Sequence, residues 1–274
     1  MALAFRPMGP IAGQDWMRRL STAWSKLRWS LAQRGLGGTL RFALARVRRR
    51  PGDGSKPQLH PFDERYGVDT SGLIGGGELR SGHRNDVFNT AYYAMAPSRF
   101  RQVMESWIAD QSHTSIGDYS FVDLGCGKGR AVLMASEFGF RQVTGVELHA
   151  ALAEIAEANV AAWTAAGRAI CPVSVVRQEA TEFVFPEGAC LLYLFNPFAA
   201  PVMKQLIEHI EIGFAERQGM LDLIYFNPEA GELLGAHQGF KLLWSGTVPM
   251  SEEDTAVDWV ASAEDLCSVY RWVG

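Results

Sequence analysis

Short apolar runs alternate with amphipathic stretches from about residue 119 to the end of the chain. Each run is rich in Val, Leu, Phe or Tyr and is bounded by turn-forming or polar residues, as expected for buried strands. Between several runs, apolar residues recur at helical spacing. The expected strands are residues 119–125, 142–148, 173–178, 190–195, 221–226, 240–248 and 267–273. This alternation predicts a doubly wound α/β fold with a mostly parallel seven-stranded sheet and helices on both faces.

The N-terminal segment differs in charge from the rest of the chain. Residues 1–60 carry 12 Lys and Arg against two Asp, a net charge of +10, whereas the remainder carries 14 basic and 28 acidic residues, a net −14. The apolar residues Trp16, Leu20, Trp24, Leu27 and Leu31 recur at helical spacing, and "RRRPGDGSKP" is typical of a linker. We therefore expect a basic amphipathic helical arm and linker over residues 1–58 and a second domain over residues 59–274.

A basic helix with tryptophans on its apolar side can lie on an anionic membrane surface. Residues 14–50 are a candidate for such a peripheral contact, and a solvated helix that packs its apolar stripe on the domain or on a partner is the simpler alternative. The four cysteines are scattered and no apolar run is long enough to span a membrane, which favours a cytoplasmic location. The dispersed histidines lack metal-ligand spacing, so we expect no metal site.

The stretch "FVDLGCGKGR", residues 121–130, follows the first of these expected strands directly. Glycines at positions 125, 127 and 129 allow a sharp turn and leave the backbone open to a ligand. In parallel sheets, ligands bind beyond the carboxyl ends of the strands. The dinucleotide fingerprint G-x-G-x-x-G does not fit, because Arg130 occupies the place of its last glycine. An NAD-dependent oxidoreductase is therefore disfavoured, and tight strand–helix turns without a ligand remain the simplest alternative.

The glycine stretch resembles the first motif of class I S-adenosylmethionine-dependent methyltransferases, an acid followed by G-x-G-x-G. The resemblance covers residues 120–274 and, more weakly, residues 85–120, and it implies a Rossmann-like domain that binds S-adenosylmethionine. In that family the acid ending the second strand, here Glu147, binds the ribose hydroxyls. Glu179 stands where the family often has Asp, so its contact with the adenine amino group is a departure. The implied cofactor residues are Asp123, Gly125, Cys126, Gly127, Gly129, Glu147, Leu148, Glu179, Ala180 and Asn196.

The fourth expected strand ends in "NPF", which partly resembles the N-P-P-[YF] motif of amino- and amide-directed methyltransferases and loosely the Dot1-type lysine methyltransferases. This likeness implies that Asn196, Pro197 and Phe198 lie on the acceptor side. An Asx turn that ends the strand is the structural alternative for Asn196. Residues 61–118 correspond to a region that often folds over the cofactor in this family as a lid, and Tyr93 in it is a further catalytic candidate.

The resemblance implies methyl transfer to an unidentified acceptor, for which we expect a small molecule, a glycan or a lipid-linked substrate. A protein N-methyltransferase, acting on lysine or a similar residue, and a non-catalytic scaffold that binds S-adenosylmethionine are the alternatives. Nucleic acid is disfavoured as a partner because the second domain is acidic and contains no base-reading module.

Three charged features near these motifs have simpler interpretations. Arg130 is expected to be a solvated residue in the first turn of a helix, and Lys128 could attract an anionic substrate. The acidic cluster 252–254 is expected to be a solvated hairpin or loop.

Overall fold

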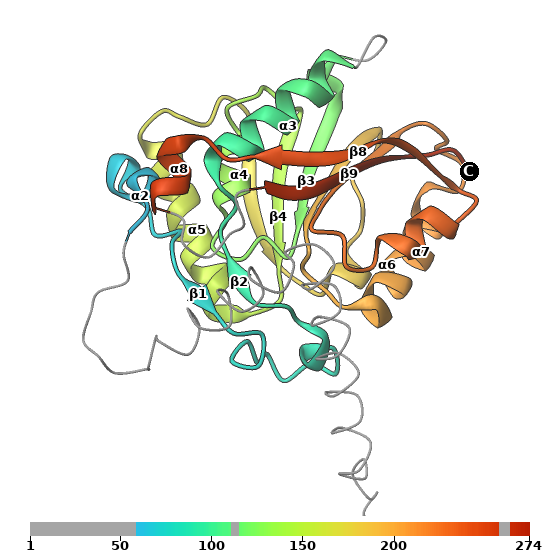
Figure 1. The fold of residues 1–274 in the computed structure, drawn as a ribbon, viewed down its shortest axis with the longest axis horizontal. Helices are drawn as coiled ribbons and strands as arrows, with labels where there is room; N and C mark the ends of the chain where they lie inside the picture. The colour runs from blue at the N-terminus through green and yellow to red at the C-terminus, as the bar shows by residue number, and fades with distance from the viewer. Residues whose placement is uncertain (1–58, 111–114, 258–263) are drawn as a thin grey trace, which may run out of the picture. The chain divides into compact units, whose positions relative to one another are not determined.

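A seven-stranded sheet forms the centre of the part of the chain that the computed structural model describes, residues 59–110, 115–257 and 264–274 (Figure 1). Its strands run in the order β5-β4-β3-β6-β7-β9-β8. Strands β3 to β7 are parallel, whereas β9 is antiparallel to both of its neighbours. The predicted sheet is therefore confirmed. The strands are β3 (Tyr119–Leu124), β4 (Gln142–Glu147), β5 (Val173–Arg177), β6 (Ala189–Phe195), β7 (Leu221–Phe226), β8 (Phe240–Pro249) and β9 (Glu264–Trp272).

Helices cover both faces of this sheet, and each face has its own apolar core. Helices α3 (Pro97–Ala109), α4 (Arg130–Ala135) and α5 (Ala150–Ala165) pack on one face, and α6 (Ala200–Phe214) and α7 (Gly231–Ala236) pack on the other. Strand β6 contributes to both cores, because its side chains alternate between the faces. Leu191 and Tyr193 enter the first core, and Leu192 and Leu194 enter the second.

The segment before α3 contains more regular structure than its turn-rich sequence suggests. Helix α2 (Pro61–Tyr66) is followed by a two-stranded antiparallel ribbon of β1 (Leu73–Ile74) and β2 (Tyr92–Tyr93). A short 3₁₀ helix, η1 (Asp86–Phe88), lies between the two strands of the ribbon. The part of this segment from residue 79 to residue 95, called the covering segment below, contributes to the pocket described in the next section.

Glu252 and Glu253 are exposed, as expected, but the interpretation of residues 252–254 as a hairpin or loop is wrong, and so is the solvated position expected for Asp254. They begin helix α8 (Glu252–Val257), and Asp254 is buried. Its carboxylate accepts a hydrogen bond of 2.8 Å from the backbone N–H of Ser98 and lies 3.4 Å from His60. Burial opposes its ionisation, but the hydrogen bonds with His60 and Ser98 lower the pKa of Asp254 to about 2. Asp254 therefore satisfies one of the free N–H groups at the start of α3.

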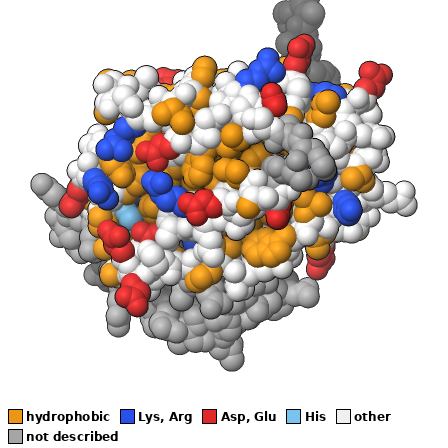
Figure 2. All heavy atoms as spheres, turned by 90° about the horizontal axis from the view of Figure 1, so that it is seen from above, with side chains coloured by type: hydrophobic (Ala, Val, Ile, Leu, Met, Phe, Trp, Pro, Cys, Tyr) orange, Lys and Arg blue, Asp and Glu red, His pale blue; other side chains and the backbone are white. Residues whose placement is uncertain are grey.

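The predicted arm, residues 1–58, lies outside the described part of the chain. Within the described ranges, no helix is long and apolar enough to cross a membrane. On the face seen in Figure 2, acidic and basic side chains are interspersed with hydrophobic ones, so this face presents no extended region of a single charge.

Candidate active site

The turn between β3 and α4, residues 125–129, is called the glycine loop here. Its three glycines have φ values of 79°, 56° and 85°, a region that L-amino acids with side chains rarely adopt. The backbone N–H groups of Gly125 and Cys126 both donate to the carbonyl oxygen of Val146, at 2.8 and 3.0 Å. The loop is thereby held against the end of β4, and a Cβ at position 127 would overlap the ring of Tyr92.

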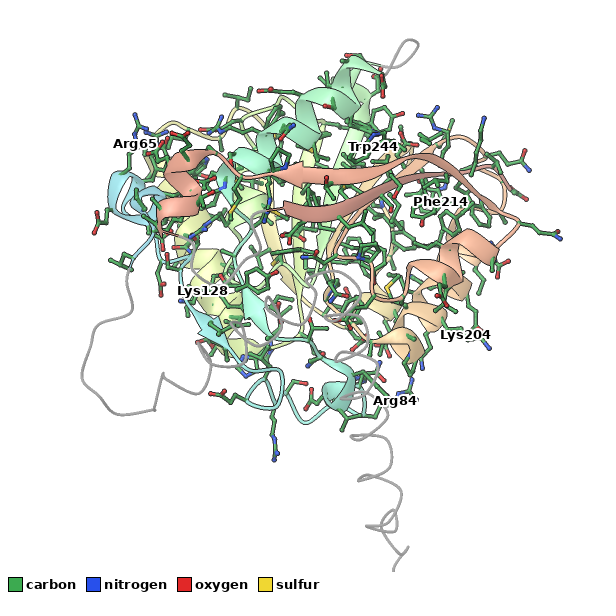
Figure 3. All side chains as sticks on the ribbon, in the orientation of Figure 1. Arg65, Arg84, Lys128, Lys204, Phe214 and Trp244 are labelled. Carbon is green, nitrogen blue, oxygen red and sulfur yellow. The ribbon has the colours of Figure 1, made fainter. Side chains whose placement is uncertain are left out.

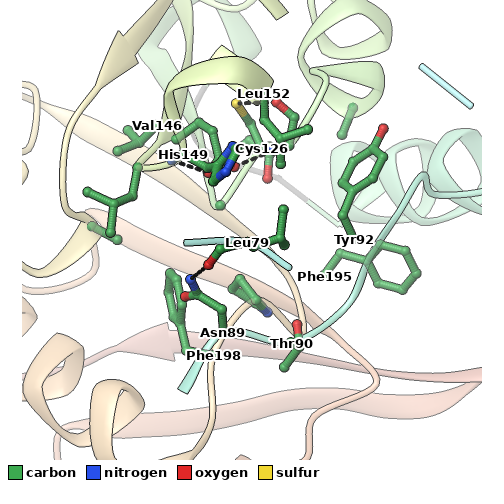
Figure 4. A pocket seen from close by; sticks show the side chains of 18 of the residues that line it. Leu79, Asn89, Thr90, Tyr92, Cys126, Val146, His149, Leu152, Phe195 and Phe198 are labelled. Atoms are coloured by element: carbon green, nitrogen blue, oxygen red, sulfur yellow. Dashed lines mark hydrogen bonds between the residues drawn. The ribbon is translucent and has the colours of Figure 1, made fainter. Parts of the chain in front are cut away.

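A pocket with about 930 Å³ of empty space, its open mouth included, lies at the carboxyl ends of the parallel strands. In Figure 4, Cys126, Val146 and His149 lie on one side of this pocket, and Asn89 and Phe198 lie on the other. Most of the cofactor residues expected from the sequence line it: Asp123, Gly125, Cys126, Gly127, Glu147, Leu148, Glu179 and Ala180.

Gly129 and Asn196 are not among the residues that line the pocket. Gly129 precedes the first residue of α4, where a Cβ would come within 3.3 Å of Ala156 on α5. It therefore serves the close packing of the two helices. Asn196 has a left-handed backbone (φ 44°), and its side-chain oxygen accepts a hydrogen bond of 3.4 Å from the hydroxyl of Tyr225. Its backbone oxygen accepts one of 2.5 Å from Thr90.

Glu147, at the end of β4, is 9% exposed and holds the loop and the helix start together. Its two oxygens accept hydrogen bonds of 2.8 Å from the backbone N–H groups of Gly127 and His149. Burial raises the pKa of Glu147, and these N–H groups oppose that rise. A carboxylate has about four acceptor positions, so Glu147 retains the capacity to accept hydrogen bonds from a pair of sugar hydroxyls.

Glu179 lines the pocket farther along the sheet and is 6% exposed. The side-chain amide of Asn85 donates to it over 3.4 Å, and the imidazole of His83 lies 3.2 Å from its other oxygen. Both partners come from the covering segment, so this segment is linked to the strand end where an adenine ring is expected to lie.

Aromatic rings line the pocket near the end of β6. The candidates Tyr93, Pro197 and Phe198 all contribute to this wall. The ring of Tyr93 packs edge-on against Phe195, with a centroid distance of 4.8 Å, and its hydroxyl lies 3.4 Å from the side-chain nitrogen of Asn227.

Two residues near this wall, Asn227 and Tyr193, were missed in the sequence. The chain repeats Phe-Asn-Pro at the ends of β6 and β7, and Phe195 pairs with Phe226. Asn196 and Asn227 are the two described non-glycine residues with a positive φ. This repetition is a signal from which Asn227 could have been found. The signal for Tyr193 is weaker, a single hydroxyl in an otherwise apolar strand.

The basic residues that flank Gly129 are not solvated, so the interpretation of Arg130 as a surface residue is wrong. Arg130 is buried, donates to the Thr70 hydroxyl over 2.6 Å and lies 3.4 Å from the carboxylate of Asp63. Lys128, which is labelled in Figure 3, donates to Asp69 over 2.6 Å and to the backbone oxygen of Ser71 over 2.8 Å. Both cations anchor residues 63–71 to the glycine loop.

Comparisons with known proteins agree with this location of the site. Residues 122–196, which run from β3 past the end of β6, match a family model described as a methyltransferase domain. A search of curated proteins found no match.

The solved structures that resemble this chain include two methyltransferases. Magnesium protoporphyrin IX methyltransferase from Synechocystis PCC 6803, with bound S-adenosylmethionine, is 14% identical, with a TM-score of 0.44 over 63% of this chain and 77% of that one. The N-methyltransferase NodS from Bradyrhizobium japonicum WM9 is 11% identical, with a TM-score of 0.45 over 65% and 99%. At these values the two structures carry no argument about the function of this chain.

The residues of the pocket fit the cofactor that the family match implies. Gly125 and Gly127 line the pocket and admit no side chain, since a Cβ would come within 2.6 Å of Pro197 or overlap the ring of Tyr92, and Glu147 offers carboxylate oxygens to a ribose. S-adenosylmethionine, when bound, supplies a methyl group on a positively charged sulfur, so the protein has mainly to align a nucleophile and exclude water. Residues 122–196 therefore form a methyltransferase domain, and S-adenosylmethionine is the cofactor that its pocket fits.

Proposed function

We propose that the acceptor of this methyltransferase is a small molecule, a glycan or the headgroup of a lipid-linked compound. The main support is the way in which the covering segment closes the pocket. The backbone N–H of Thr90 donates to the oxygen of Pro197 over 3.2 Å, and that of Ala199 donates to Phe88 over 2.9 Å. With the bond between Thr90 and Asn196, these contacts make a recess rather than an open groove. A recess favours an acceptor that enters whole or by one end.

The chemistry of the recess favours an uncharged acceptor group with a flat or apolar body. Rings from Tyr93, Phe195 and Phe198 line it, and such rings bind flat apolar groups well. Lys128 and Arg130, the basic residues beside the glycine loop, are both engaged in ion pairs with acids of residues 63–69. Neither is therefore available to neutralise a phosphate or carboxylate.

In this proposal Tyr93, Pro197 and Phe198 position the acceptor near the methyl group. The Tyr93 hydroxyl, next to Asn227, is the polar group that would orient a hydroxyl or amine nucleophile. The rings around it would keep water away from the reacting atoms, which raises the chance that methyl transfer rather than hydrolysis follows binding.

The test uses cofactor carrying an isotopically labelled methyl group, incubated with purified full-length protein and a cell lysate. The reaction is separated into low-molecular-weight, lipid and protein fractions. We expect the label in the first or second fraction, and its absence from both with label in protein bands would favour the protein N-methyltransferase instead. Glu147→Ala serves as the matched control, because it should lower cofactor binding and hence the label in every fraction.

A further inference from the structure

The two Phe-Asn-Pro turns at the ends of β6 and β7 share a backbone conformation but engage their amides in different places. Asn196 and Asn227 both have a left-handed backbone, with φ of 44° and 48°. They follow Phe195 and Phe226, which pair with each other on neighbouring parallel strands. Because the two turns are equivalent and adjacent, the surroundings of the two amides can be compared directly.

The amide of Asn196 is engaged with the core on the face of the sheet that α6 and α7 cover. Its side-chain oxygen accepts a hydrogen bond of 3.4 Å from the hydroxyl of Tyr225, a residue of that core. The same hydroxyl accepts from the backbone N–H of Ala230 over 3.4 Å. Asn196 is not among the residues that line the pocket. The amide that the resemblance implies on the acceptor side therefore has another role in the fold.

The amide of Asn227 contacts a residue of the pocket wall instead. Asn227 is 4% exposed, and its side-chain nitrogen donates to the hydroxyl of Tyr93 over 3.4 Å. Tyr93 lines the pocket, and its ring packs edge-on against that of Phe195. Asn227 itself does not line the pocket, so any effect that it has on a bound acceptor passes through Tyr93.

The backbone of Asn227 is held from two sides. Its N–H donates to the carbonyl oxygen of Leu266 on β9 over 2.8 Å, and its own carbonyl oxygen accepts from the N–H of Glu229 over 2.8 Å. Glycine would satisfy this backbone conformation equally well and has no amide to bury. A buried amide that donates to a hydroxyl of the pocket wall therefore indicates a role beyond the turn.

The contact between the two side chains suits an acceptor group that forms hydrogen bonds. A phenol hydroxyl can both donate and accept. Donation from Asn227 occupies one lone pair of the Tyr93 oxygen, which restricts the directions in which this hydroxyl can meet a further group. A hydroxyl or amine of the acceptor can hydrogen-bond to Tyr93 in such a direction and keep a lone pair facing the methyl carbon.

We propose that Asn227, and not Asn196, is the amide that positions the methyl acceptor, and that it acts through the hydroxyl of Tyr93. Asn227 is thus a positioning residue, because it does not touch the acceptor. The proposal rests on the proposed function, since it concerns the acceptor side of the same pocket. It predicts that the two Asn residues differ in their effect on methyl transfer although they occupy equivalent turns.

The test compares glycine at the two positions in the full-length protein. Glycine removes the amide and adopts the left-handed backbone without strain. The measurement is the rate at which labelled methyl enters the low-molecular-weight and lipid fractions of a lysate at saturating S-adenosylmethionine. Asn227→Gly should lower this rate about tenfold, the effect of one hydrogen bond, whereas Asn196→Gly should retain most of it. The reverse order would assign the role to Asn196 and overturn the proposal.

A double-mutant cycle with Tyr93→Phe, which removes only the hydroxyl, separates positioning from a purely structural role. If Asn227 acts through that hydroxyl, the double variant should transfer methyl no more slowly than Tyr93→Phe alone. The affinity for S-adenosylhomocysteine, measured by calorimetry, should stay at the wild-type value in every variant. Additive losses of rate, or a loss of cofactor affinity that accounts for them, would contradict the proposal.

Asn227→Asp serves as a second variant if glycine unfolds the protein. Asp also tolerates the left-handed backbone, but an ionised carboxylate has no N–H to donate. This variant should therefore be about as slow as Asn227→Gly. Wild-type rates in both Asn227 variants would refute the positioning role and leave the proposed acceptor class intact.

Failure of the proposed function gives a different result. Label found only in protein bands with the wild type would refute the proposed acceptor class, and the same variants assayed on the protein fraction would still decide the role of Asn227. Absence of label from every fraction would overturn both proposals.

Discussion

Gly127 donates its backbone N–H to the carboxylate of Glu147 over 2.8 Å, which joins the glycine loop to the end of the neighbouring strand. The same carboxylate also accepts from His149 at the start of α5. One side chain thus fixes two backbone segments that line the pocket. The residue expected to bind the ribose is therefore also a structural support of the loop.

Replacing Glu147 by Ala should weaken binding of S-adenosylhomocysteine by about 1–3 kcal/mol, the usual cost of losing hydrogen bonds to a charged group. The loss combines the missing acceptor for the ribose with a loosened glycine loop. Calorimetry measures it, with Glu154→Ala on the exposed side of α5 as the control. Unchanged affinity in the Glu147 variant would remove this residue from the cofactor site.

A side chain at position 127 should abolish cofactor binding. Gly127→Val places a Cβ into the ring of Tyr92 and strains a backbone with φ 56°. Gly167→Ala is a matched control for the strain alone, because that glycine also has a positive φ (70°) and its Cβ would meet nothing within 4 Å. Binding of S-adenosylhomocysteine should be lost in the first variant and kept in the second. Normal affinity in Gly127→Val would contradict the assignment of the pocket.

The raised pKa of Asp123 predicts how stability depends on pH. Burial, and after it the charge of Glu147, hold the pKa of Asp123 well above its ordinary value of 3.8. In the pH interval between 3.8 and this raised pKa, the folded state keeps a proton that the unfolded chain has lost. Stability of the unliganded protein therefore falls as pH rises through the interval. Other ionisable groups that face Asp123 are Cys126 in the glycine loop and Tyr193 on β6, and burial raises the pKa of both.

Asp123→Asn removes this cost, so the variant should be more stable than the wild type at neutral pH and equal to it near pH 3.8. Asp222→Asn provides the contrast, because Asp222 is paired with Arg271 and Trp107 and its loss should destabilise by roughly 3 kcal/mol. Thermal unfolding as a function of pH measures both. Equal destabilisation by the two substitutions would show that Asp123 has a partner in the folded protein.

The two cations beside Gly129 should differ in their contribution to stability. Arg130→Met leaves the fully buried carboxylate of Asp63 without its ion pair, which should cost about 3–5 kcal/mol. Lys128→Met should cost at most about 1 kcal/mol, because the side chain of its partner Asp69 is 56% exposed. Denaturant unfolding measures the loss of stability in each variant. A larger loss in the Lys128 variant than in the Arg130 variant would contradict this account of how residues 63–71 are anchored.

The strands and the main helices could be predicted because burial imposes a regular spacing of apolar residues on the sequence. The run "CLLYLF" has no polar interruption apart from one tyrosine, and in the fold both faces of β6 are covered. The glycine loop could also be predicted, because a strand followed by G-x-G-x-G is compatible with few structures other than a sharp turn. The order of the strands within the sheet was not predicted, because the apolar pattern along the chain does not specify which strands are neighbours.

The charged residues were harder to predict, because their environment depends on residues far away in the chain. From the sequence, Arg130 is expected to be solvated because it lies in the first turn of a helix. In the fold it is buried and donates hydrogen bonds to Asp63 and Thr70. Asp254 lies in an acidic cluster typical of a surface, yet it accepts a hydrogen bond from Ser98 at the start of α3. In both cases the partner belongs to a different element, far away in the chain.

The paired Phe-Asn-Pro turns at the ends of β6 and β7 have a consequence for sequence comparison. At Asn196 and Asn227 the backbone conformation, and not the amide alone, restricts which amino acid fits, since φ is 44° and 48°. Glycine adopts this conformation without strain, and Asn tolerates it better than most other residues do. A library of all substitutions should therefore retain folded protein with glycine at either position more readily than with glutamine, the chemically closest replacement.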